Sequence, residues 1–126
     1  MSALVVGDCL TNPAGSDQVE DVQFLVVPCS LAHSSEVIGL PSLEGGAYPG
    51  DDSVSAQADD TCSSVFTAYV GVSIYDTTAI DVSAYTPAQA DWSAGRHTVV
   101  CVAFSPAGYT IGTVKGIGAA APRTAP

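Results

Sequence analysis

The chain has 126 residues, 47% of them hydrophobic, and carries 13 acidic against 3 basic residues for a formal net charge of −10. This length suits a single domain, and the hydrophobic content excludes a wholly disordered chain. The negative charge disfavours nucleic acid and anionic membrane surfaces as partners, because both repel an acidic protein. Such a surface suits solubility, cations or a basic partner.

No part of the chain is expected to insert into a membrane. No unbroken apolar stretch approaches the roughly 20 residues that span a bilayer. The first residues, Met1–Leu4, have neither the basic start nor the long apolar core of a signal peptide. If the domain works outside the cytoplasm, we therefore expect it to be a segment of a longer, membrane-anchored protein.

The first half of the chain predicts short strands separated by loops. A strand over Ala3–Val6 is followed by a loop over Thr11–Ser16, where Asn-Pro and Ala-Gly pairs are typical of turns. Val22–Val27 is rich in β-branched and aromatic residues and is the clearest strand of this half. A third strand is predicted over Glu36–Leu40, before a Gly/Pro-rich loop over Pro41–Gly50.

A main helix is predicted over about residues 52–70. Its apolar residues recur at the spacing of one buried helical face, at Val54, Ala58, Cys62, Val65, Phe66 and Tyr69. Asp51 or Ser53 is expected to cap the first turn, and Gly71 suits the C-terminal cap.

The second half predicts short strands and one short helix. In order, we expect strands at Val72–Ile74 and Ile80–Tyr85, a helix at about 87–94 capped by Thr86, a strand at His97–Phe104, a hairpin turn at Ser105–Gly108 and a strand at Tyr109–Lys115. The strand before the hairpin is apolar on both faces, which is typical of a central position.

The predicted fold class is α+β, a small, mostly antiparallel sheet with one main helix, a short second helix and two disulfides. The predicted domain covers residues 1–117. Residues 118–126 form an Ala/Pro-rich tail that we expect to be a disordered linker.

The four cysteines predict two disulfides and therefore a compartment outside the reducing cytoplasm, because their number is even, their spacing is wide and no CxxC occurs. Cys9 and Cys29 bracket a strand–loop–strand unit, whereas Cys62 lies on the helix face and Cys101 on the core strand. The pairings Cys9–Cys29 and Cys62–Cys101 are favoured, contributing at most about 3 and about 4 kcal/mol. All three connectivities stay open at this point, as does the alternative of free structural thiols.

Zinc is another interpretation of the same residues. Cys29 with His33, and His97 with Cys101, resemble a two-cysteine, two-histidine set. His97 and Cys101, however, lie four residues apart on a predicted strand, which separates them by about 13 Å. Ligands of one zinc ion lie about 4 Å or less apart, so we expect no metal site and no cofactor.

An ordered set of short motifs is similar to the septum formation domain of actinobacterial membrane-anchored envelope proteins. The motifs are Gly7-Asp8-Cys9, Val27-Pro28-Cys29, His33-Ser34-Ser35-Glu36-Val37, Tyr48-Pro49-Gly50, the helix with Cys62, Phe66, Tyr69 and Gly71, then Pro87, Trp92-Ser93-Ala94-Gly95-Arg96, Val99-Val100-Cys101 and Gly112-Thr113-Val114-Lys115-Gly116. The resemblance covers about residues 5–117. It implies an outward-facing domain that follows a transmembrane helix, which this sequence lacks, and a link to cell division.

Two polar clusters are candidates for function. His33 and Glu36 could bind a metal or act as acid and base, although a loop histidine bonded to backbone near Cys29 is the favoured interpretation. Trp92 and Arg96 could form a stacking surface for sugar or peptide. We favour a Trp92 that packs on the core and an Arg96 that pairs with an acidic neighbour.

Other patterns give little support for chemistry. The carboxylate pairs Asp51/Asp52 and Asp59/Asp60 lack the spacing of a calcium loop and suit a solvated helix face. Gly112–Gly118 lacks the GxxxxGK[ST] pattern of a phosphate loop, and GxSxG is absent.

The sequence therefore predicts an extracytoplasmic, non-enzymatic binding domain of the cell envelope, whose partner is an envelope protein or cell-wall material. The alternatives are a small envelope hydrolase that uses His33 and Glu36, and a purely structural spacer or shell component.

Overall fold

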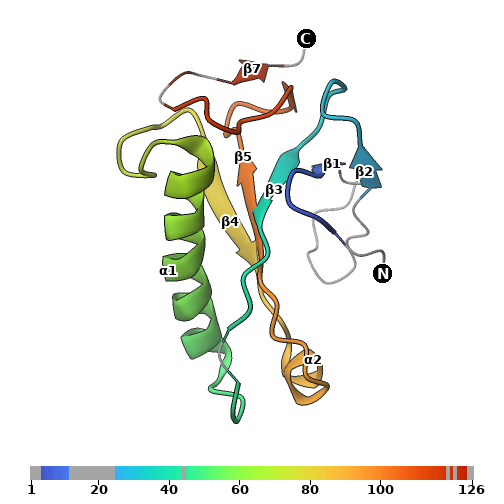
Figure 1. The fold of residues 1–126 in the computed structure, drawn as a ribbon, viewed down its shortest axis with the longest axis vertical. Helices are drawn as coiled ribbons and strands as arrows, with labels where there is room; N and C mark the ends of the chain where they lie inside the picture. The colour runs from blue at the N-terminus through green and yellow to red at the C-terminus, as the bar shows by residue number, and fades with distance from the viewer. Residues whose placement is uncertain (1–3, 12–24, 44, 119, 121, 125–126) are drawn as a thin grey trace.

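The computed structural model of the protein describes residues 4–11, 25–43, 45–118, 120 and 122–124. In this part of the chain, one long helix lies across a five-stranded antiparallel sheet with the strand order β2-β1-β3-β5-β4, and two further strands form a small second sheet. Figure 1 shows α1 running alongside β4, with α2 at one end of the molecule and β7 at the opposite end. The predicted α+β class is confirmed.

The main sheet consists of short strands. They are β1 (Cys9–Thr11), β2 (Leu25–Val27), β3 (Ser35–Gly39), β4 (Asp81–Tyr85) and β5 (Val100–Phe104). The apolar residues on both faces of β5 predicted a central strand, and β5 indeed lies between β3 and β4. Glu36 is opposite Ala103 in this register, and Ala84 is opposite Cys101.

Helix α1 (Asp51–Val70) buries one face against the sheet. Four of the six residues predicted for this face are fully buried, namely Val54, Ala58, Cys62 and Phe66. Val65 and Tyr69 are partly buried, and Val70, which was not predicted, is buried as well. Phe66 is completely buried and forms part of the core cluster that includes Ile38, Val99 and Cys101 of the sheet side. The hydrophobic contact between this face and the sheet is the main source of stability for the fold.

The sequence predicted the capping residue correctly at the C-terminal end of α1 and wrongly at the N-terminal end. Gly71 adopts the left-handed conformation with φ 94°, and its N–H donates to the Thr67 carbonyl at 3.0 Å, so the predicted C-terminal cap is confirmed. The predicted side-chain cap at Asp51 or Ser53 is wrong. Gly50 is the N-cap, with no side-chain capping bond, because Asp51 and Ser53 already lie inside the helix.

Several element boundaries also differ from the prediction. Residues 4–6 of the expected strand Ala3–Val6 form no strand, because Asp8 closes a turn by accepting a hydrogen bond from the Val5 N–H. Residues Val72–Ile74 belong to a turn, in which the Ser73 carbonyl accepts from the Asp76 N–H. Residues 12–24, which include most of the loop predicted at Thr11–Ser16, lie outside the described residues.

Helix α2 (Gln89–Ser93) is shorter than the predicted 87–94. Its N-cap is Ala88, not Thr86. The Asp91 carboxylate accepts a hydrogen bond from the Ala88 N–H at 3.1 Å, and the helix begins two residues later than Thr86 and Pro87 suggested.

The end of the chain folds back onto the domain. A turn at Ser105–Gly108 is confirmed, since the Gly108 N–H donates to the Ser105 carbonyl at 3.2 Å. The following strand β6 (Thr110–Ile111) is shorter than predicted and pairs with β7 (Arg123–Thr124). Part of the expected linker tail is therefore a paired strand.

Both predicted disulfides are present. Cys9–Cys29 joins β1 to the residues after β2, and Cys62–Cys101 joins α1 to β5, with Cα–Cα distances of 5.3 and 5.4 Å. Because Cys29 and Cys101 belong to different bridges, the zinc set that we considered from the sequence does not assemble.

Candidate functional site

The His33–Glu36 pair lies inside the protein. Each side chain is only 1% exposed. A ring nitrogen of His33, a carboxylate oxygen of Glu36 and Sγ of Cys9 all lie within 4.8 Å of one another. We call these three residues the buried polar cluster. In the oxidised protein Cys9 is bonded to Cys29, so its sulfur is not available as a thiolate ligand.

Glu36 joins the sheet to residues 110–114, which we call the C-terminal segment. One carboxylate oxygen, Oε2, accepts hydrogen bonds from the Tyr69 hydroxyl at 2.5 Å and the Thr113 hydroxyl at 2.7 Å. The other, Oε1, accepts from the Val114 N–H at 2.9 Å. A buried carboxylate needs such donors to offset its desolvation. Glu36 therefore connects β3 to α1 and to the chain after β6.

The environment of Glu36 also acts on Tyr69. Burial of the phenol raises the pKa of Tyr69 to about 12, and the hydrogen bond to Glu36 and its negative charge add to this effect. Tyr69 thus remains a neutral hydrogen-bond donor to Glu36 throughout the physiological range. Tyr69 therefore has a structural role, since its hydrogen bond joins α1 to Glu36 of β3.

His33 fastens the neighbouring part of the same segment. Its backbone exchanges two hydrogen bonds of 3.0 Å with Thr110. Its Nδ1 lies 2.8 Å from the Leu31 carbonyl, which confirms the predicted backbone-bonded loop histidine. Nε2 is only within 3.5 Å of the Thr110 hydroxyl, at the limit for a hydrogen bond. With both side chains buried, the pair has no open face for a substrate.

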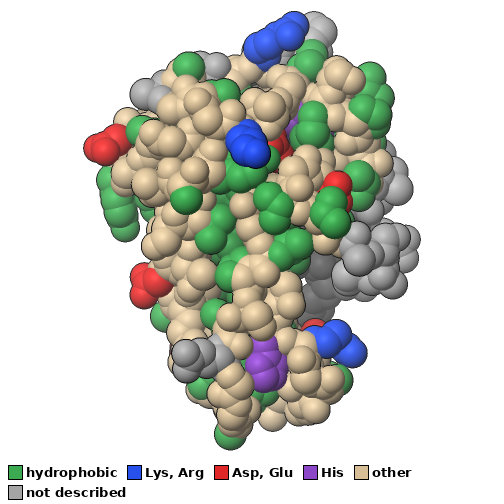
Figure 2. Space-filling model, viewed as in Figure 1, with side chains coloured by type: hydrophobic (Ala, Val, Ile, Leu, Met, Phe, Trp, Pro, Cys, Tyr) green, Lys and Arg blue, Asp and Glu red, His purple; other side chains and the backbone are tan. Residues whose placement is uncertain are grey.

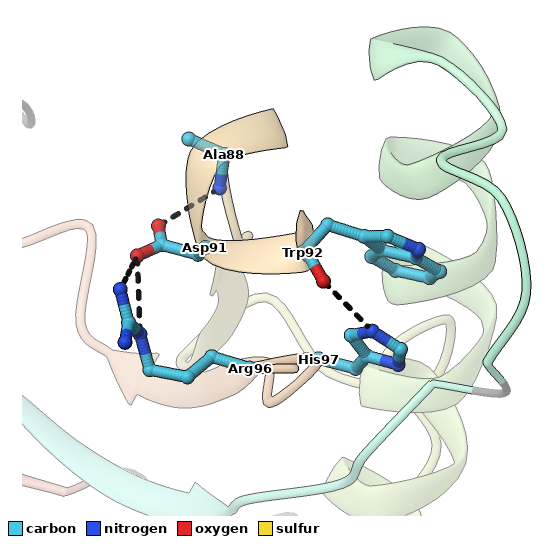
Figure 3. Close-up of polar contacts among 5 residues, drawn as sticks. All are labelled: Ala88, Asp91, Trp92, Arg96 and His97. Carbon is cyan, nitrogen blue, oxygen red and sulfur yellow. Dashed lines mark hydrogen bonds and ion pairs between the residues drawn. The ribbon is translucent and has the colours of Figure 1, made fainter. Parts of the chain in front are cut away.

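Trp92 is part of the core at the α2 end of the molecule. It is 5% exposed, and its Nε1 donates to the Gly46 carbonyl at 2.9 Å. The His97 ring stacks on it with a centroid distance of 3.9 Å, while the His97 Nε2 lies 3.2 Å from the Trp92 carbonyl (Figure 3). The rings of Tyr48 and Trp92 lie edge to face, with their centroids 5.9 Å apart. The indole is thus packed as predicted, not offered to a ligand.

Arg96 pairs with an acidic neighbour, as the favoured interpretation predicted. Its Nη2 lies 3.0 Å from a carboxylate oxygen of Asp91, on the opposite side of α2 from the indole (Figure 3). The hydrogen bond from Arg96, followed by that from the Ala88 N–H, lowers the pKa of Asp91. The structure therefore does not combine Trp92 and Arg96 into one stacking surface.

A surface groove between α1 and β4 was not predicted from the sequence. It has a volume of about 300 Å³ and is lined by Asp59 and Asp60 of α1 and by Asp81 of β4. Tyr75, which is 88% exposed, lies at the same groove. Its apolar lining includes Ile74, Val82 and Ala84. We call this the α1–β4 groove.

The groove escaped sequence analysis because its parts come from separate elements. Asp59 and Asp60 are exposed on α1, as a solvated helix face predicts. Asp81 comes 21 positions after Asp60 and reaches the same place only because β4 packs beside α1. The signal in the sequence was Tyr75 next to Asp76, between the two strands predicted at Val72–Ile74 and Ile80–Tyr85.

Positive charge is sparse and scattered by comparison. The chain contains 3 Lys and Arg residues in all, and Figure 2 shows no gathering of basic side chains on the face it presents. Within the described residues, no helix is both long and apolar enough to cross a bilayer.

A comparison with known families decides the classification. The family described as "Septum formation" matches residues 4–101. The chain belongs to the septum formation family. The matched region contains all four cysteines and Glu36, whereas Thr113 and Val114, which donate hydrogen bonds to Glu36, lie beyond its end. No curated protein and no solved structure matches the chain.

Proposed function

We propose that this member of the septum formation family is an extracytoplasmic, non-enzymatic binding domain of an envelope protein that acts in cell division. We further propose that a basic segment of a partner protein docks in the α1–β4 groove. The observation that carries this proposal is the groove itself, which is lined by three carboxylates, an exposed tyrosine and a mixture of apolar and small polar residues.

The extracytoplasmic location is supported by the two disulfides. Bridges persist in oxidising compartments and are reduced in the cytoplasm. One bridge ties β1 to the segment after β2 and the other ties α1 to β5, so both join separate parts of the fold. Membership of the septum formation family agrees with a place in the cell envelope.

The chemistry of the α1–β4 groove fits Lys or Arg side chains. Asp59, Asp60 and Asp81 provide negative charge for an ammonium or guanidinium group, and the net charge of −10 draws basic partners from a distance. Ile74 and Val82 suit the methylene stems of such side chains. The exposed ring of Tyr75 adds a face for a cation–π contact.

The burial of His33 and Glu36 supports a binding role over the hydrolase alternative, which relies on these two residues. A general acid or base must reach its substrate, within hydrogen-bond distance or through one water. His33 and Glu36 are both 1% exposed and are bonded to Leu31, Tyr69, Thr113 and Val114. Their positions suit a structural role.

Site-specific photo-crosslinking in the native envelope tests the proposal. Tyr75 is replaced by a photoreactive phenylalanine derivative in the full-length, membrane-anchored protein. Ser93, an exposed residue of α2 at the other end of the molecule, is the control position (Figure 1). We expect the Tyr75 probe to capture one repeatable protein partner and the Ser93 probe to miss it. A partner captured equally from both positions, or from neither, contradicts docking in the groove and favours a structural spacer.

A further inference from the structure

Four metal-ligating side chains meet around the Cys9–Cys29 bridge. Cys9, His33 and Glu36 place one potential ligand atom each within 4.8 Å of one another, and Sγ of Cys29 is bonded to that of Cys9. All three members of the buried polar cluster are 1% exposed. Two sulfurs, one imidazole nitrogen and one carboxylate oxygen thus lie close together, and only Cys29 among the four residues is partly exposed.

Both non-sulfur ligands have a lone pair available. Oε1 of Glu36 accepts one hydrogen bond, from Val114, while the other two donors go to Oε2. A carboxylate oxygen has two lone pairs, so Oε1 retains one. On His33, Nδ1 is 2.8 Å from the Leu31 carbonyl, whereas the contact of Nε2 is 3.5 Å long. A backbone carbonyl on one ring nitrogen orients the other as a ligand.

The Cys9–Cys29 bridge is the one that a reductant can reach. Cys29 is half-buried, whereas Cys62 is 1% exposed and Cys101 is fully buried. Thiol–disulfide exchange begins with attack of a thiolate on an accessible sulfur. Under native conditions, reduction is therefore expected to open Cys9–Cys29 and to leave Cys62–Cys101 closed.

We propose that reduction of this bridge converts the buried polar cluster into a zinc site, with Cys9, Cys29, His33 and Glu36 as the four ligands. Two thiolates, an imidazole and a carboxylate suit tetrahedral Zn²⁺. Ligand atoms around one zinc ion lie about 4 Å apart, and those of Cys9, His33 and Glu36 are already within 4.8 Å of one another; Cys29 is freed to join them when its bond to Cys9 opens.

The chemistry of the switch balances with a dithiol as the reductant and a disulfide as the oxidant. A dithiol reductant breaks the Cys9–Cys29 bond, becomes a disulfide itself and leaves two protein thiols. Binding of Zn²⁺ then releases the two thiol protons. In the reverse direction, a disulfide oxidant takes two electrons from the thiolates and two protons from solvent, leaves as a dithiol, and expels Zn²⁺ as the bridge re-forms. The domain would thus hold the metal only in its reduced form.

The test measures Zn²⁺ binding to the whole domain in both redox states. The protein is reduced under native conditions with a phosphine, which is then removed, and alkylation followed by intact mass counts the opened thiols. Zinc is titrated against a chromophoric chelator, and Co²⁺ serves as a spectroscopic probe for thiolate ligation. We expect two opened thiols, one Zn²⁺ bound per reduced chain, a thiolate-to-cobalt charge-transfer band, and no binding to the oxidised chain.

Variants identify the ligands. His33→Ala and Glu36→Gln are each expected to weaken Zn²⁺ binding by at least about tenfold, the loss that even outer partners of metal ligands produce. His97→Ala removes the other histidine, which stacks on Trp92, and is expected to leave the affinity unchanged. If His33→Ala does not fold, Glu36→Gln and the comparison of the two redox states still test whether the cluster binds Zn²⁺. The proposal is overturned by four opened thiols, by equal binding in both redox states, or by an affinity that neither substitution lowers.

Discussion

Removal of the Glu36 carboxylate tests whether this residue fastens the C-terminal segment to the sheet. In Glu36→Ala, the Val114 N–H loses its acceptor, and Val114 is only 5% exposed. An orphaned buried donor costs about 1–3 kcal/mol. The Tyr69 and Thr113 hydroxyls are half-buried and exposed, so water replaces much of what they lose. We therefore expect Glu36→Ala to lower the free energy of unfolding by about 2–3 kcal/mol.

Glu36→Gln should be milder, at about 1 kcal/mol, because the amide oxygen still accepts from one or two of the donors. Urea unfolding of the oxidised protein measures both values, with Asp76→Ala as the control that removes an exposed carboxylate at a cost within about 0.5 kcal/mol. Hydrogen exchange adds a local readout, since the Val114 amide should exchange faster in Glu36→Ala. An unchanged urea midpoint together with unchanged exchange at Val114 would refute the role assigned to Glu36.

Three further predictions concern the core, the packing of α1 on β3 and the ion pair at α2. Phe66→Ala should destabilise the protein by about 3–5 kcal/mol, because the ring is completely buried; thermal unfolding checks this, and a loss under 1 kcal/mol contradicts it. A Cβ at Gly39 would lie 2.5 Å from the Val65 Cγ1, so Gly39→Ala should cost about 1–3 kcal/mol and Val65→Ala should rescue it; additive losses in the double-mutant cycle would exclude the clash. The carboxyl of Asp91 should titrate with a pKa below 3.8, and Arg96→Gln should raise that pKa. Because the folded-state pKa is lowered, the ion pair stabilises the protein at pH values above it, and this stabilisation is lost as the pH falls through it. An NMR titration of Asp91 that is unaffected by the substitution would contradict the pairing.

The sequence predicted the parts of the fold that depend on local periodicity. The spacing of Val54, Ala58, Cys62 and Phe66 defines the buried face of α1, and this face also placed Cys62 where it meets Cys101. The apolar residues on both sides of β5 predicted its central position. These features follow from side-chain patterns within one element, which tertiary contacts here reinforce.

Features that depend on contacts between distant segments could not be predicted from the sequence pattern. Glu36 receives its donors from Tyr69, Thr113 and Val114, which lie 33 to 78 positions away in the sequence. The α1–β4 groove needs Asp81 beside Asp60, and no pattern along the chain specifies that packing. Short elements such as α2 also shifted, because single hydrogen bonds decide where they begin.

The same limit applies to the candidate site residues. Their residue types suggested chemistry, since a His–Glu pair is a familiar acid–base or metal set. Only the structure shows that both side chains are 1% exposed and joined to the C-terminal segment. The sequence around positions 33 and 36 gave little indication that both side chains are buried, and burial favours a structural role for this pair.

The central claim is that this domain is held by two disulfides and works outside the reducing cytoplasm. Its most direct test uses full-length protein taken from the native envelope, with thiols alkylated at lysis under denaturing conditions before and after reduction. We expect none of the four cysteines to be labelled without reductant and all four to be labelled after it. Labelling of all four without reductant would contradict both the bridges and the extracytoplasmic location.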